Sequence, residues 1–119
     1  ILLAHSLGGI ACVDLLAQED LSATVVGLIT VGSQAPFLYE SNALTGLPYG
    51  VRLPQFFPRW LNIYDIGDLL SYKAEDAFQN HAKILDVEVS SYLPFPLSHS
   101  AYWKNPDTWD AVMDWIDAR

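Results

Sequence analysis

The chain has 119 residues, of which 51% are apolar and 17% are charged, so its composition is that of one globular domain and not of a disordered segment. Acidic residues outnumber basic residues 14 to 6 and no basic stripe is present, which disfavours a nucleic-acid partner. The longest mostly apolar run, residues 25–31, is too short to span a bilayer, so no transmembrane segment is expected. The single cysteine excludes an internal disulfide framework, and no His/Cys cluster has the spacing of zinc ligands.

The chain begins inside an apolar segment, residues 1–4, without an initiator methionine or the charged region of a signal peptide. A buried strand normally follows a surface loop, so we expect this chain to be a piece of a longer protein that lacks its N-terminal part. The missing signal peptide therefore carries no information about localisation. The sequence leaves both the cellular compartment and the oligomeric state open.

The predicted elements of the first half are two strands with a helix between them. Residues 1–5 are predicted to form a short buried strand, and residues 8–18 a helix that is apolar on nearly all sides and therefore buried. The β-rich run of residues 25–31 is typical of a parallel strand covered on both faces. An irregular segment, residues 34–59, follows. Its four prolines disfavour regular strand pairing, and aromatic residues lie between them.

The second half is predicted to contain two more strands and a final helix. Residues 60–64 and 82–89 are the strands, and residues 90–98 form a loop. A helix follows over residues 106–118, with Asn105 as its cap, and its apolar face is predicted to consist of Trp109, Val112, Met113 and Ile116. Strands separated by helices or long crossovers indicate an α/β fold with a largely parallel sheet and flanking helices. Four strands make a thin sheet with an apolar edge, which again predicts further strands before residue 1.

The most informative segment is residues 4–9, AHSLGG, between the first strand and the first helix. A small-x-Ser-x-Gly turn at this place is the arrangement of a nucleophile elbow, in which a strained turn projects the hydroxyl of Ser6 above the sheet. Ala4 and Gly8 supply the small residues that the tight turn needs, and Gly9 lets the following helix pack closely. The N-terminus of that helix directs its free N–H groups at the serine, where they stabilise a developing oxyanion.

This segment and its context resemble the α/β-hydrolase family, and in particular its lipase- and esterase-like members, which usually have glycine where this chain has Ala4. The resemblance extends over the whole chain, so residues 1–119 are predicted to be the C-terminal portion of a single α/β-hydrolase domain. It implies that Ser6 is the nucleophile and that the backbone N–H of Leu7 is one donor of the oxyanion hole. In the family, the second donor belongs to a loop that would precede residue 1.

A serine nucleophile needs a histidine base that is oriented by a carboxylate, and in this family the three residues follow in the order serine, acid, histidine. Two acids, Asp65 and Asp68, follow the predicted strand at residues 60–64. Asp68 fits the resemblance best because it lies in the turn beyond the strand end, with apolar residues after it. Asp65 is the alternative acid, or a turn residue that accepts backbone N–H groups.

The chain has three histidines as candidates for the base. His99 lies where the family carries its catalytic histidine, after the last strand and shortly before the final helix. His81, which precedes that strand, is the alternative, or a surface residue. His5 adjoins the serine in sequence, so its side chain is expected to point away from the serine hydroxyl and to pack or hydrogen-bond beside the elbow.

The resemblance therefore implies a serine hydrolase that cleaves carboxylic ester bonds of a lipid-like or small acyl substrate through an acyl-enzyme, without a metal or an organic cofactor. Residues 34–59 are expected to be a lid or pocket loop, or a loop that packs its own aromatic side chains on the sheet. The same triad also serves acyltransferases, thioesterases and peptidases, and the fold also serves as a non-catalytic interaction module. A different α/β fold with a coincidental elbow would place His99 far from Ser6.

Overall fold

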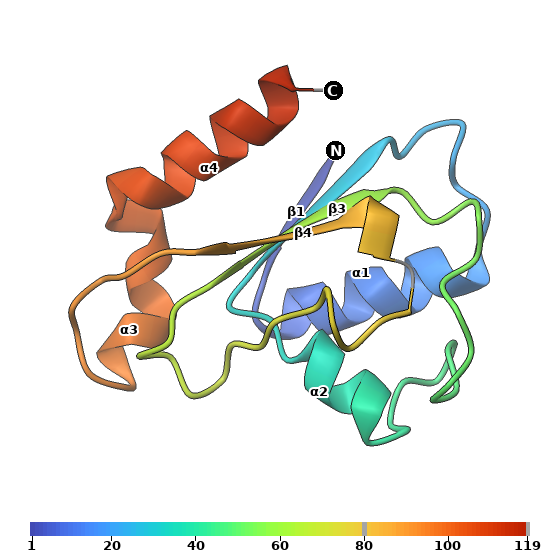
Figure 1. Ribbon diagram of the computed structural model, residues 1–119, viewed down its shortest axis with the longest axis horizontal. Coiled ribbons are helices and arrows are strands. Elements are labelled where there is room, and N and C mark those ends of the chain that lie inside the picture. Colours follow the sequence, from blue (N-terminus) through green and yellow to red (C-terminus); the bar gives the residue numbers. More distant parts are fainter. Residues whose placement is uncertain (80, 119) are drawn as a thin grey trace.

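A computed structural model describes residues 1–79 and 81–118, which are built around one four-stranded parallel sheet (Figure 1). The strands lie side by side in chain order, and each neighbouring pair is parallel. Their bounds are β1 (Leu2–His5), β2 (Gly27–Val31), β3 (Arg59–Tyr64) and β4 (Ile84–Glu88). The predicted α/β class is therefore confirmed, and each strand begins and ends inside its predicted range or within one residue of it.

Helices cover both faces of the sheet (Figure 1). Successive side chains of a strand point to opposite faces, so Leu28 and Trp60 join one core and Ile29 and Leu61 join the other. The first core lies against α1 (Leu7–Gln18) and α2 (Ala35–Glu40), and the second lies against α4 (Pro106–Asp117). Strand β2 is buried along its whole length, as its apolar sequence predicts. No helix in the described ranges is long and apolar enough to cross a membrane.

The prediction that the first helix is buried on nearly all sides is wrong. Only Gly9, Val13 and Leu16 of α1 are buried, whereas Leu7 and Leu15 are exposed. The buried residues recur at intervals of four and three, which is one face of a helix that packs on one face of a sheet. Ile10, Cys12 and Ala17 are partly buried and pack against the edge of this core.

The buried face of the last helix also differs from the predicted one. Asn105 caps α4 as expected, because its side chain accepts a hydrogen bond from the backbone N–H of Asp107 at 3.0 Å. However, Trp109 and Met113 are exposed, and the buried residues are Thr108, Val112 and Trp115. The indole of Trp115 decides the orientation of the helix, because it packs tightly on Gly27 of β2 and lies 4.0 Å beneath the guanidinium of Arg59.

Two short helices lie in segments that the sequence predicts as irregular. The first is α2, where Pro36 occupies the first turn and its missing N–H is not needed by the helix. The second is α3 (Leu97–Ser100), which is continued by the 3₁₀ helix η2 (Ala101–Lys104). Residues 41–58 are irregular, and their most buried side chains, which lie in the core against α1, are Leu47, Leu53 and Phe57. A lid or pocket role for this segment stays a prediction.

The parallel strands place their carboxyl ends at one edge of the sheet. Ser6 follows β1 directly, Gln34 lies shortly after β2, and Asp65 and Asp68 follow β3. His99 follows β4 after a loop and lies in α3. In open parallel sheets, this edge is where the segments that bind ligands gather.

We expect Gly9→Ala to lower the free energy of unfolding by about 1–3 kcal/mol through overpacking. An added Cβ would lie 2.8 Å from the Cβ of Ser33 and closer still to its hydroxyl, and Ser33 is fully buried. Gly8→Ala is the matched control, because a Cβ there meets Ala4 at an ordinary 3.5 Å and changes stability by less than about 1 kcal/mol. Urea denaturation measures both variants. Equal losses at the two positions would contradict the close packing of α1 on the sheet.

Candidate active site

The turn between β1 and α1 holds Ser6 in a strained backbone conformation. Its φ is 55° and its ψ is −120°, a combination that L-residues rarely adopt and that costs about 1–3 kcal/mol. The backbone N–H of Ser6 donates to the carbonyl of Val31 at 3.0 Å, which ties the turn to the end of β2. The strained strand-to-helix turn that the sequence predicts is therefore present.

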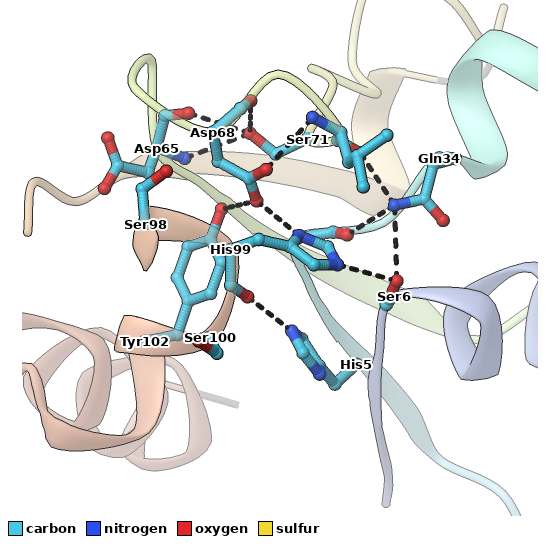
Figure 2. Close-up of polar contacts among 12 residues, drawn as sticks. His5, Ser6, Gln34, Asp65, Asp68, Ser71, Ser98, His99, Ser100 and Tyr102 are labelled. Atoms are coloured by element: carbon cyan, nitrogen blue, oxygen red, sulfur yellow. Dashed lines mark hydrogen bonds and ion pairs between the residues drawn. The ribbon is translucent and has the colours of Figure 1, made fainter. Parts of the chain in front are cut away.

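His99 links Ser6 to Asp68 through its two ring nitrogens (Figure 2). Its Nε2 lies 2.9 Å from the Oγ of Ser6, and its Nδ1 lies 2.8 Å from the Oδ2 of Asp68. The three side chains come from three different segments that lie far apart in the sequence. The alternative in which His99 lies far from Ser6 is therefore wrong.

The carboxylate of Asp68 is buried, and the side chain of His99 is 18% exposed. Besides His99, two donors reach this carboxylate. The hydroxyl of Tyr102 donates to Oδ2 at 2.7 Å, and the backbone N–H of Leu70 donates to Oδ1 at 3.0 Å. A buried carboxylate needs such donors, because its desolvation is costly.

The sequence leaves two roles open for Asp65, the orienting acid or a turn residue, and the structure shows the contacts of a turn residue. Its Oδ1 accepts the N–H of Gly67 at 2.8 Å, and its Oδ2 accepts the N–H of Ser91 at 3.0 Å. Both carboxylate oxygens are therefore used by backbone donors, and Asp65 makes no hydrogen bond to His99. This side chain joins the turn after β3 to the loop after β4.

Two further hydrogen bonds hold the helix that carries His99. The hydroxyl of Ser98 donates to the carbonyl of Gly67 at 2.9 Å. The Nε2 of His5 lies 2.8 Å from the backbone carbonyl of His99, and their rings lie 5.0 Å apart (Figure 2). The prediction that His5 packs or hydrogen-bonds beside the elbow is therefore confirmed.

Gln34 is part of the site, although the sequence analysis did not single it out. Its Nε2 donates to the carbonyls of Gly32 at 3.0 Å and Leu70 at 2.8 Å, and lies 3.4 Å from the Oγ of Ser6 (Figure 2). The amide thereby joins the end of β2 to the turn that carries Asp68. Gln34, like Ser6, lies shortly after the carboxyl end of a parallel strand, and this position is the sequence signal that could have identified it.

Tyr102 is the second residue that the sequence analysis missed. Burial, and then the hydrogen bond to Asp68, raise the pKa of its phenol, so the hydroxyl stays protonated and acts as a donor. Tyr102 lies three residues after His99, and this spacing places both on one side of a helical turn. The sequence predicts a loop up to residue 98 and no helix directly after it. The three-residue spacing of His99 and Tyr102 is informative only once the segment is known to be helical.

Leu7 and His81 are the other residues that the sequence singles out. Leu7 is the first residue of α1, so its backbone N–H has no acceptor within the helix and lies next to Ser6. His81 begins the 3₁₀ helix η1 (His81–Lys83) ahead of β4, and its side chain lies outside the described part of the structure. Among the described side chains, the imidazole at hydrogen-bond distance from the hydroxyl of Ser6 is that of His99.

The arrangement can move a proton from the serine hydroxyl. His99 Nε2 is at hydrogen-bond distance from Ser6 Oγ, which is the geometry that a general base requires. Asp68 accepts a hydrogen bond from Nδ1–H of His99 and so keeps Nε2 unprotonated, as the acceptor for the serine proton. Comparisons of the chain with protein-family models, with curated proteins and with solved structures found no match. The function must therefore be argued from this geometry.

We expect Ser6→Gly to be more stable than Ser6→Ala by about 1 kcal/mol, because glycine adopts positive φ without a steric penalty. Ser100 provides the control, since its φ of −110° suits any residue and alanine should there be the more stable replacement. Chemical denaturation of the four variants gives the free energies. The same order at both positions would contradict the strain at Ser6.

Proposed function

We propose that this chain is the portion of an α/β-hydrolase domain that carries the catalytic serine, acid and histidine, and that it cleaves carboxylic esters through an acyl-enzyme. Ser6 is the nucleophile, His99 the general base and acid, and Asp68 the orienting acid. The single observation that supports this proposal most strongly is the hydrogen-bonded series Ser6–His99–Asp68, which starts on a strained strand-to-helix turn.

The proposed reaction uses each of these groups in turn. The Oγ of Ser6 attacks the acyl carbonyl while His99 Nε2 takes its proton, and Asp68 stabilises the imidazolium that forms. The backbone N–H of Leu7 donates to the oxyanion of the tetrahedral intermediate. His99 then gives its proton to the departing alkoxide, which leaves the acyl group on Ser6. Water, activated by the same histidine, releases the acid and restores the serine.

The surroundings of the site favour an apolar acyl group as the substrate. Leu7 adjoins Ser6 in sequence, Leu69 adjoins Asp68, and Leu97 lies two residues before His99. These three leucines are 73%, 68% and 59% exposed. A fatty acyl chain or another apolar acyl group would cover such leucines on binding, which is favourable because apolar surface leaves water. The formal charge of −8 disfavours anionic substrates.

A fluorophosphonate probe tests the nucleophile, since it reacts with a serine hydroxyl only when a neighbouring base activates it. We expect the full-length protein to be labelled at Ser6, and we expect Ser6→Ala and His99→Gln to abolish labelling. Ser100→Ala, which removes an exposed hydroxyl beside His99, is the matched control and should label normally. A wild type that is folded yet not labelled would contradict the proposal.

A panel of p-nitrophenyl esters of graded chain length tests the reaction. We expect turnover that falls by about 10³-fold or more in Ser6→Ala, His99→Gln and Asp68→Asn. The preferred chain length defines the size of the acyl site. If the serine is labelled but no ester is turned over in a serine-dependent way, ester hydrolysis is the wrong reaction, and transfer of the acyl group to an acceptor other than water is favoured.

A further inference from the structure

Tyr102 and His99 reach the same carboxylate oxygen from the same short segment. His99 is in α3 and Tyr102 is in η2, which follows it without a break. Nδ1 of His99 lies 2.8 Å from Asp68 Oδ2, and the hydroxyl of Tyr102 lies 2.7 Å from that atom (Figure 2). His99 and Tyr102 therefore both hydrogen-bond to the same carboxylate oxygen, Oδ2 of Asp68.

The negative charge of Asp68 is balanced without a lysine or an arginine. Within residues 1–79 and 81–118, the only ion pair is the one between Asp68 and His99, and it exists only when the histidine is protonated. While His99 is neutral, the donors on the carboxylate are its own Nδ1–H, the hydroxyl of Tyr102 and the N–H of Leu70. Tyr102 thus supplies one of three hydrogen bonds that stabilise a buried charge.

Gly32 gives independent support for a built contact at this point. It has a φ of +59°, and a Cβ there would lie 2.8 Å from the ring of Tyr102 and 3.1 Å from Asp68 Oδ2. The backbone at the end of β2 therefore packs directly against the tyrosine and the carboxylate together. Tyr102 itself is 1% exposed, so its ring cannot move aside without opening the core.

We propose that Tyr102 is a positioning residue that holds Asp68 Oδ2 against His99 and sets the pH above which His99 acts as a base. The hydroxyl disperses part of the carboxylate charge, so the carboxylate attracts the proton of an imidazolium less strongly. Removing the hydroxyl leaves the charge more concentrated. His99 should then keep its second proton to a higher pH, and Ser6 should become reactive only at that higher pH. This inference rests on the proposed function for its catalytic meaning.

Other ionisable groups lie close enough to affect the same titration. His5 packs against both rings, at 5.0 Å from His99 and 6.2 Å from Tyr102, and Asp65 acts on Tyr102 electrostatically from the turn after β3. Because the imidazole of His5 packs against both rings, the comparison of tyrosine variants is made both in the wild type and in a His5→Asn background. The effect of Tyr102 should be the same in both.

The decisive measurement is the pH at which the ring nitrogen signals of His99 change in the NMR spectrum of the full-length protein, assigned with His99→Gln. In Tyr102→Phe we expect this midpoint to rise by at least half a pH unit, about a threefold gain in proton affinity. Tyr39→Phe is the matched control. Tyr39 is also fully buried, and its hydroxyl donates to the carbonyl of Val51 at 2.9 Å in the core against α1. It should leave the midpoint unchanged.

A variant that preserves the packing tests the sign of the effect if Tyr102→Phe does not fold. Replacing Tyr102 by 3-fluorotyrosine makes the hydroxyl a stronger donor, so the midpoint should move to lower pH. An unchanged midpoint in either folded variant would overturn the inference, even if the fluorophosphonate labels Ser6. Shifted midpoints in a protein that is never labelled would instead retain the inference about Asp68 and His99 and reject the proposed hydrolase.

Discussion

The buried carboxylate of Asp68 is the constraint on which the site depends. An unpaired charge in the interior is costly, and the structure meets that cost with donors from the turn that follows β3 and from the segment after β4. Each donor has a second task. Leu70 belongs to the turn that presents Asp68, His99 reaches Ser6, and Tyr102 fills the core against β2. Satisfying one charge therefore fixes the relative positions of these segments.

Hydrogen bonds between the loops extend this constraint along the whole edge of the sheet. Asp65 joins the turn after β3 to the loop after β4, and Gln34 joins the end of β2 to that same turn. His5, at the end of β1, bonds to the carbonyl of His99. The segment at each of these four strand ends is thus hydrogen-bonded to the segment at another strand end through a side chain. Such loops are preorganised, which a reaction needs when its groups must meet within a few tenths of an ångström.

The sequence predicts the sheet well because its strands carry local signals. Runs of mostly apolar residues mark β1 to β3, and the small residues around Ser6 mark the turn after β1. Strands β2 and β3 are buried, but the predicted burial of the first strand is wrong, because Ala4 is the one buried residue of β1. The order of Asp68 and His99 along the chain, together with the resemblance to a family, indicates which histidine contacts the serine and which acid contacts that histidine. These predictions need the order of elements, the rule that parallel strands end at one edge, and the resemblance.

What the sequence does not predict depends on contacts between distant segments. The burial of Trp115 rather than Trp109 follows from the space above Gly27 and the guanidinium of Arg59. Gln34 and Tyr102 belong to the site because of partners that lie more than thirty residues away. Residue type does not distinguish Asp65 from Asp68, so the prediction of Asp68 rests on the resemblance, and the folded turn shows that Asp68 is the one that faces His99.

The continuity of α3 and η2 also determines where the chain tolerates a change of length. One residue inserted between His99 and Tyr102 would rotate the second side chain by about 120° around the helical axis and take it off the carboxylate. One residue inserted beside Tyr92, which is 94% exposed in the preceding loop, would only lengthen a solvent-facing connection. In an alignment of relatives that share this site, gaps should therefore collect in the loop after β4 and be missing from the four residues that begin at His99.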